Sequence, residues 1–307
     1  MGRLQSRGFL PLFDAMSVLE SRSEYLEVRG LRYHLRHWGQ DPAPRVLFLH
    51  GWMDSSPTFQ FVVEALARDW HVIAPDWRGY GASEWLGRPY WFPDYYADLD
   101  QLLAHTFPGR PARVVGHSMG GSVAAAYAGL RPGRVQELAV LDFLGLKPPP
   151  AEQGAADTLL TWLEGIASPP RLRAYKDREQ LARWLMAVNP RLLPERAAFL
   201  AERVSRERPD GQVEMACDPW HKVPAPHPYR IEDAMDCWRR VEARVLQLVA
   251  DQGYVQQRFG ARPEEFRRRL DCFRQLRLET VVDAGHNLQH DQPEQVARVL
   301  EDFLSRD

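Results

Sequence analysis

The sequence of 307 residues lacks several features that would each place it in a specialised class of protein. It has only three cysteines, Cys217, Cys237 and Cys272, which lie far apart and form no Cys-x-x-Cys pair. We therefore expect neither a disulfide framework nor a zinc site, and we expect a reducing compartment. Because no run of about 18 apolar residues occurs, we predict no membrane-spanning helix.

Excess charge is also lacking, since 39 basic residues face 41 acidic ones and the net charge is −2. This balance favours neither a nucleic-acid-binding surface nor an acidic tail. Residues 1–23 contain no continuous apolar stretch typical of a signal peptide. We expect a cytoplasmic monomer or homodimer that acts on a small molecule, without nucleic-acid or membrane partners.

Short apolar segments alternate with amphipathic segments along the chain. The sequence predicts a β-hairpin over 24–37, further strands at 45–49, 71–75, 135–141, 243–250 and 278–282, and one strand that enters Ser118. Helical periods occur at 57–68, 93–107, 122–130, 262–273 and 293–304. Strands that alternate with helices predict a parallel, doubly wound sheet of the α/β class.

This alternation stops between residues 143 and 242, where no run typical of a buried strand occurs. Helical periods there carry Leu159, Trp162, Leu163, Leu181, Trp184 and Leu185, and a proline-rich loop follows at 219–228. We predict a helical cap over 143–242, inserted into a core of 24–142 and 243–307, with an N-terminal tail at 1–23.

The segment from Val114 to Gly121 reads Val-Val-Gly-His-Ser-Met-Gly-Gly and precedes an alanine-rich helical pattern. In a Gly-x-Ser-x-Gly turn between a strand and a helix, the serine sits on a sharp elbow that needs glycine on both sides. The elbow exposes the hydroxyl at the end of the strand, and the helix N-terminus favours negative charge there. Ser118 is therefore a candidate nucleophile.

Four motifs stand in a recognisable order, namely His50-Gly51-Trp52, Asp76-Trp77-Arg78-Gly79-Tyr80-Gly81-x-Ser83, Gly116-x-Ser118-x-Gly120-Gly121 and Asp283-x-Gly285-His286. With these motifs the chain resembles the α/β-hydrolase superfamily over roughly 24–142 and 243–305, and most of all its serine-hydrolase-like branch. The resemblance implies a mostly parallel, doubly wound, eight-stranded sheet with a dehalogenase-type helical cap after strand 6. Haloalkane dehalogenases have aspartate in place of Ser118, so dehalogenation is disfavoured.

The resemblance also implies roles for individual residues. A serine needs a base within hydrogen-bonding reach, and His286 supplies it. The backbone amides of Trp52 and Met119 form the implied oxyanion hole. Most superfamily members carry the acid at the position that aligns with Gly253 here.

Two aspartates remain open as that acid. Asp251 lies two residues before Gly253 and reaches the histidine if the loop turns sooner. Asp142 stands at the end of the preceding strand, a location that some dehalogenase-like enzymes use. We favour Asp142.

We expect His50, His117, Asp283 and Asp291 to have structural roles, in which their side chains support loops. We expect Trp77, Trp85, Tyr90 and Trp91 near the substrate pocket, at the mouth of the sheet, whereas most cap aromatics form the core of the lid. An aromatic-lined pocket favours a hydrophobic acyl compound.

These residues together predict a serine hydrolase without cofactor or metal, which cleaves a small or medium ester through an acyl-enzyme. The same residues also allow carbon–carbon bond hydrolysis, lactone opening or acyl transfer, because a fold does not decide function. A binding protein with a degenerate triad is a further alternative.

Overall fold

The structure is a computed structural model that describes residues 18–147, 150 and 153–304. The N-terminal tail predicted over 1–23 lies mostly outside the described residues. Its last two residues, Arg22 and Ser23, begin the first strand.

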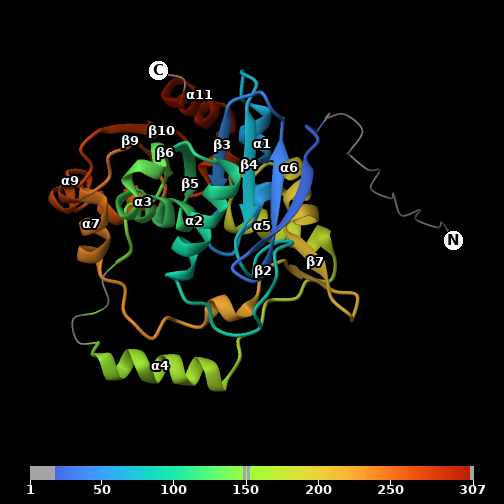
Figure 1. Ribbon diagram of the computed structural model, residues 1–307. Helices are drawn as coiled ribbons and strands as arrows, with labels where there is room; N and C mark the ends of the chain where they lie inside the picture. The colour runs from blue at the N-terminus through green and yellow to red at the C-terminus, as the bar shows by residue number, and fades with distance from the viewer. Residues whose placement is uncertain (1–17, 148–149, 151–152, 305–307) are drawn as a thin grey trace.

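An eight-stranded sheet forms the centre of the molecule (Figure 1). Its strands are β1 (Arg22–Val28), β2 (Leu31–Trp38), β3 (Arg45–Leu49), β4 (His71–Asp76), β5 (Ala112–His117), β6 (Val135–Leu141), β9 (Arg244–Ala250) and β10 (Leu276–Val281). They lie in the order β1-β2-β4-β3-β5-β6-β9-β10. Only the β1–β2 and β2–β4 pairs are antiparallel, so the mostly parallel sheet is confirmed.

The central strands are apolar on both faces because helices cover both faces. In β3, Leu47 and Leu49 point into one hydrophobic cluster, while Val46 and Phe48 point into the other. This period of two follows from the pleat of a strand.

Two helical layers enclose the sheet (Figure 1). One layer contains α2 (Asp94–Thr106), α3 (Met119–Leu130), α7 (Ile231–Arg239), α8 (Tyr254–Phe259) and α9 (Pro263–Leu270). The other contains α1 (Gln60–Glu64), α10 (Leu288–Asp291) and α11 (Pro293–Leu304). Short 3₁₀ turns are η1 (Ser56–Phe59), η2 (Pro132–Arg134) and η3 (Pro219–Lys222).

The structure differs from the predicted helices at one split helix and at two short helices that were not predicted. The helix predicted over 57–68 is split into η1 and α1, and α1 ends at Glu64. Helices α8 and α10 were not predicted, since six and four residues are too few to show a helical period.

The chain between β6 and β9 contains α4 (Ala155–Ala167), α5 (Arg178–Val188), α6 (Pro194–Arg203), β7 (Ser205–Glu207), β8 (Val213–Met215), η3 and α7. The antiparallel β7–β8 pair was not predicted, because three-residue strands are too short to show alternation. Helices α5 and α6 share a hydrophobic cluster that includes Phe61 of the core. Helix α4 lies apart from the sheet at the lower edge of Figure 1, whereas α7 packs on the core.

Within the described part of the chain, no helix has both the length and the apolarity needed to cross a bilayer.

Candidate active site

Ser118 occupies a strained turn between β5 and α3, with φ of 49° and ψ of −112°. The neighbouring glycines make this turn possible. A Cβ atom on Gly120 would lie 2.1 Å from the carbonyl oxygen of Leu49, and one on Gly116 would lie 2.5 Å from the amide nitrogen of Gly121. The backbone therefore comes too close at both glycines for any side chain, as the Gly-x-Ser-x-Gly pattern predicts.

Backbone strain gathers at the carboxyl ends of the parallel strands. Apart from Arg29 in a hairpin turn, the non-glycine residues with positive φ among those described are Met53, Ser118, Asp142 and Asp283. These four follow β3, β5, β6 and β10, respectively. Such conformations cost about 1–3 kcal/mol each and concentrate at functional sites, so this edge of the sheet is the candidate site.

The imidazole of His286 lies between Ser118 and Asp142. Its Nε2 atom is 2.9 Å from the Ser118 hydroxyl oxygen, and its Nδ1 atom is 2.8 Å from a carboxylate oxygen of Asp142. A carboxylate only accepts hydrogen bonds, so Nδ1–H is the donor and Nε2 is free to accept the serine proton.

Asp142 is fully buried, and its carboxylate is well supplied with donors. Backbone amides of Ala250, Tyr254 and Val255 donate to it at 3.2, 2.6 and 3.4 Å. A buried carboxylate needs such donors to stay ionised. This arrangement suits a residue that orients His286.

Asp251, the other candidate acid, has a different position. Its carboxylate accepts the backbone amides of Asp283 and Ala284, each at 3.0 Å. Burial raises the pKa of the Asp251 carboxyl, but these two amides, the charge of Arg191 and the side chain of Gln252 together lower it below its usual value. The structure thus places Asp142, and not Asp251, on His286.

The absence of a side chain at Gly253 leaves room for the Asp142 carboxylate. A Cβ atom on Gly253 would lie 2.4 Å from a carboxylate oxygen of Asp142. An aspartate at 253 would therefore enter the space that the Asp142 carboxylate fills. A side chain at one of the two positions excludes a side chain at the other.

The segment that carries Trp52 lies against the elbow. A Cβ atom on Gly51 would lie 3.4 Å from the Ser118 Cβ. The His50 ring holds this segment, because Nδ1–H donates to the Gly51 carbonyl at 2.8 Å and Nε2 accepts the Trp77 amide at 2.9 Å. Burial lowers the pKa of His50 to about 4, so the ring is neutral.

Met119 is the first residue of α3, and the amides of a first helical turn have no acceptor within the helix. The segment that carries Trp52 lies on the other side of Ser118, so the backbone amides of Trp52 and Met119 remain the predicted oxyanion hole.

The predicted pocket tryptophans differ in exposure. Trp77 has no exposed surface and donates its indole N–H to the His50 carbonyl, so it packs the loop and does not line an open pocket. This corrects the prediction. Trp85 lies under the Arg206 guanidinium at 3.6 Å, and Trp91 is 43% exposed, so both remain predictions.

Two tryptophans near the elbow should respond differently to truncation. Trp77→Ala is expected to lower the free energy of unfolding by about 3–5 kcal/mol, because it empties a fully buried site. Trp52→Ala should change it by less than about 0.5 kcal/mol, since that side chain is 54% exposed. Urea denaturation of both variants measures the difference, and equal losses would contradict this account.

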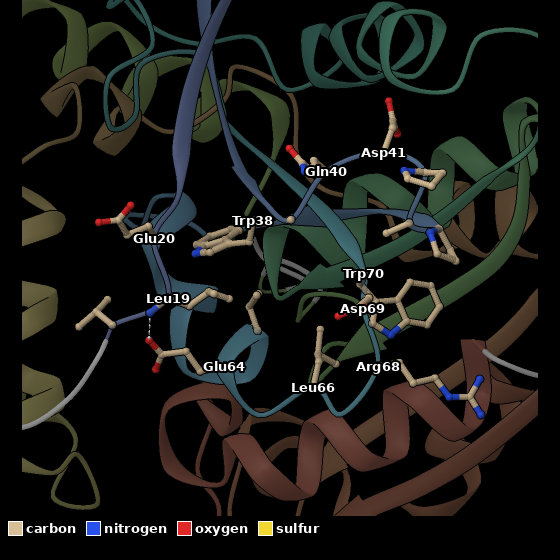
Figure 2. A pocket seen from close by; sticks show the side chains of 16 residues that line it. Leu19, Glu20, Trp38, Gln40, Asp41, Glu64, Leu66, Arg68, Asp69 and Trp70 are labelled. Carbon is tan, nitrogen blue, oxygen red and sulfur yellow. Dashed lines mark hydrogen bonds between the residues drawn. The ribbon is translucent and has the colours of Figure 1, made fainter.

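A groove of about 1290 Å³ opens elsewhere, lined by residues that include Trp38, Leu66 and Trp70 (Figure 2). It lies where β3 and β4 begin, whereas Ser118 follows the end of β5. Ligands of parallel α/β sheets bind at the carboxyl ends of the strands, so the groove is separate from the candidate site. Among the described residues, no group of three or more His, Cys, Asp or Glu side chains is placed to hold a metal ion.

Sequence reasoning missed one feature of the site, the contact of the insertion with the His286 loop. Asn189, in the turn between α5 and α6, donates to Asp291 at 2.7 Å. A single asparagine in a turn carries no motif, so no sequence signal indicated it.

Comparison with known proteins adds to this geometry. A family model described as the alpha/beta hydrolase fold matches residues 44–181. The chain has the α/β-hydrolase fold. The thioesterase domain from the curacin biosynthetic pathway shares this hydrolase fold, with a TM-score of 0.82 and 24% identity over 92% of this chain and 99% of that domain.

Sequence relatives of the chain include proteins named serine hydrolase-like and one named an esterase. A serine hydrolase-like protein of Danio rerio is 29% identical over 87% of this chain and 83% of its own length. A pimeloyl-[acyl-carrier protein] methyl ester esterase of Chromobacterium violaceum is 43% identical over 32% of this chain and 36% of its own length. These similarities support a hydrolase.

Proposed function

We propose that the protein is a serine hydrolase that cleaves a small or medium, hydrophobic ester-type acyl substrate. The observation that supports this most is the continuous chain of hydrogen bonds from Ser118 through His286 to the buried Asp142. A serine hydroxyl is a weak nucleophile at neutral pH and acts only with an oriented base beside it. In this proposal the three residues form the catalytic triad.

In the first half of the reaction, the Ser118 oxygen attacks the carbonyl carbon of the ester while its proton passes to Nε2 of His286. The negative charge that develops on the carbonyl oxygen is stabilised by the amides of Trp52 and Met119. The intermediate then collapses. The bond to the alcohol breaks, and His286 returns its proton to that leaving group.

In the second half, a water molecule attacks the acyl-enzyme. His286 takes the water proton, the carbonyl oxygen again becomes negative, and release of the acid returns the proton to Ser118. Asp142 accepts the hydrogen bond from Nδ1–H of His286 throughout. It holds the tautomer of His286 and stabilises the imidazolium in each half.

The relatives support an acyl substrate. One is named a methyl ester esterase and a structural neighbour is named a thioesterase domain, so both names describe acyl chemistry at a carbonyl carbon. Carbon–carbon hydrolysis, lactone opening and acyl transfer use the same catalytic groups. A panel of p-nitrophenyl esters from acetate to octanoate, assayed with and without an added alcohol, separates hydrolysis from transfer.

The proposal predicts selective labelling of Ser118. Exposure to a fluorophosphonate should add one adduct to the wild-type protein and none to Ser118→Ala, because only a serine beside a working base attacks phosphorus quickly. Intact-protein mass spectrometry measures the adduct. Ser122→Ala, a serine one turn further along α3, is the matched control and should label like the wild type.

Absence of an adduct on folded wild-type protein contradicts the proposal and favours a binding protein with a degenerate triad. Thermal melting recorded on the same samples establishes that each variant is folded.

A further inference from the structure

The loop that carries His286 is held by side chains from three parts of the chain. Asp251 accepts the amides of Asp283 and Ala284, and Asp291 accepts the amide of Gly285 at 2.8 Å. The ring of His117 is 2.9 Å from the carbonyl oxygen of His286 through Nε2. Every amide from Asp283 to Gly285 therefore has a carboxylate acceptor.

The His117 ring donates this hydrogen bond. Its other nitrogen, Nδ1, faces the amide nitrogen of Gln289 at 3.4 Å and accepts from it. Burial lowers the pKa of His117 well below its usual value, so the ring is neutral and Nε2 carries the proton. This contact fixes the loop from the sheet side.

Asp291 differs from the other anchors because it also bonds the insertion. One of its carboxylate oxygens accepts Gly285 N–H, and the other accepts the side-chain amide of Asn189 at 2.7 Å. A single carboxylate thus joins the turn between α5 and α6 to the residue that precedes His286.

A second contact of the same turn reaches the same loop. The Arg191 side chain lies 3.5 Å from Asp283 and also bonds the side chain of Gln252. The backbone amide of Gln252 in turn donates to the Ala284 carbonyl at 3.0 Å. The turn between α5 and α6 is therefore fastened to the loop at two points, only one of which bears directly on Gly285.

We infer that Asn189 and Asp291 are positioning residues that set the place of His286 and so couple the insertion to the base. The inference rests on the proposed function. A displacement of Asn189 shifts Asp291, and with it the Gly285 amide. Because a misplacement of about 1 Å can reduce a rate about 10²-fold, a small shift at this loop is sufficient to alter turnover.

Exchange of the two side chains tests this coupling. Asn189→Asp places two carboxylates next to each other, and their repulsion displaces Asp291 from the Gly285 amide. This variant should lower kcat about 10–100-fold, with KM within about twofold of the wild-type value. In the double variant Asn189→Asp/Asp291→Asn, the new amide donates to the new carboxylate, and its oxygen again accepts Gly285 N–H. Most of the lost kcat should return.

Gln212→Glu is the matched control, because it adds the same charge to an exposed turn of the same insertion and should leave kcat unchanged. The rate of fluorophosphonate labelling should follow kcat in every variant, since it reports on His286 without a substrate. A purely structural role would lower the melting temperature without this pattern of loss and return.

The inference is overturned if Asn189→Asp keeps the wild-type kcat, or if the folded double variant remains as slow as the single one. If the double variant does not fold, Asn189→Ala decides. It should lower kcat about tenfold at constant KM, because Asp291 loses one donor, and an unchanged kcat rejects the coupling. Lack of labelling in the wild type itself would instead reject the proposed function.

Discussion

Asp142→Asn is expected to lower kcat about 10⁴-fold, the size of the effect when the acid of a Ser-His-Asp enzyme becomes an amide. The new amide group can donate to Nδ1 of His286. That reverses the tautomer, places the proton on Nε2 and leaves the ring unable to accept from Ser118. Ester turnover and the rate of fluorophosphonate labelling should both fall, while thermal melting reports whether the fold persists.

Asp251→Asn is the matched control for this prediction. Asp251 accepts two backbone amides of the His286 loop and does not contact the imidazole. Its replacement should therefore loosen the loop and lower kcat by less than about 10²-fold. A large loss in Asp251→Asn together with an unaffected Asp142→Asn would contradict the assignment of the acid.

The acid is also expected to be movable. Asp142→Gly should be as inactive as Asp142→Asn. The double variant Asp142→Gly/Gly253→Asp should have a kcat at least about 10²-fold higher than Asp142→Gly, since the two substitutions act on one carboxylate position. Glycine suits position 142, where φ is 47°. Position 253 is extended, with φ of −85° and ψ of −170°, so it accepts an aspartate.

Gly253→Asp alone is the control for this exchange. With Asp142 still present, the added side chain meets a carboxylate whose oxygen lies 2.4 Å from the new Cβ atom. Two carboxylates then compete for one space, and both turnover and stability should fall. A double variant as inactive as Asp142→Gly would show that a carboxylate from position 253 does not reach His286.

Asp142 follows β6 directly and therefore stands at the start of the segment that connects β6 to β9. The insertion is therefore joined to the proposed triad at its start by the chain itself. At the turn between α5 and α6 it is joined again through Asn189 and Asp291. Substitutions in the insertion can thus act on His286 without contact to a substrate.

The sequence by itself determined the parallel core and the elbow. Apolar runs such as 45–49 and the glycines around Ser118 express local rules, because strand pleating and turn sterics act over a few residues. The candidate His286 came from the resemblance of its motif to the α/β hydrolases, and the topology of the sheet is consistent with it. Parallel strands bring their carboxyl ends to one edge, so residues that follow different strands meet there.

Only the tertiary structure shows that Asp142, and not Asp251, lies against His286. Asp142 and His286 are 144 residues apart, and their contact depends on how three loops turn, on the positive φ at 142 and on the absent side chain at 253. The burial of Trp77 depends likewise on the His50 loop folding over it. Such contacts join loops whose paths are set by long-range packing, and local patterns in a sequence do not encode those paths.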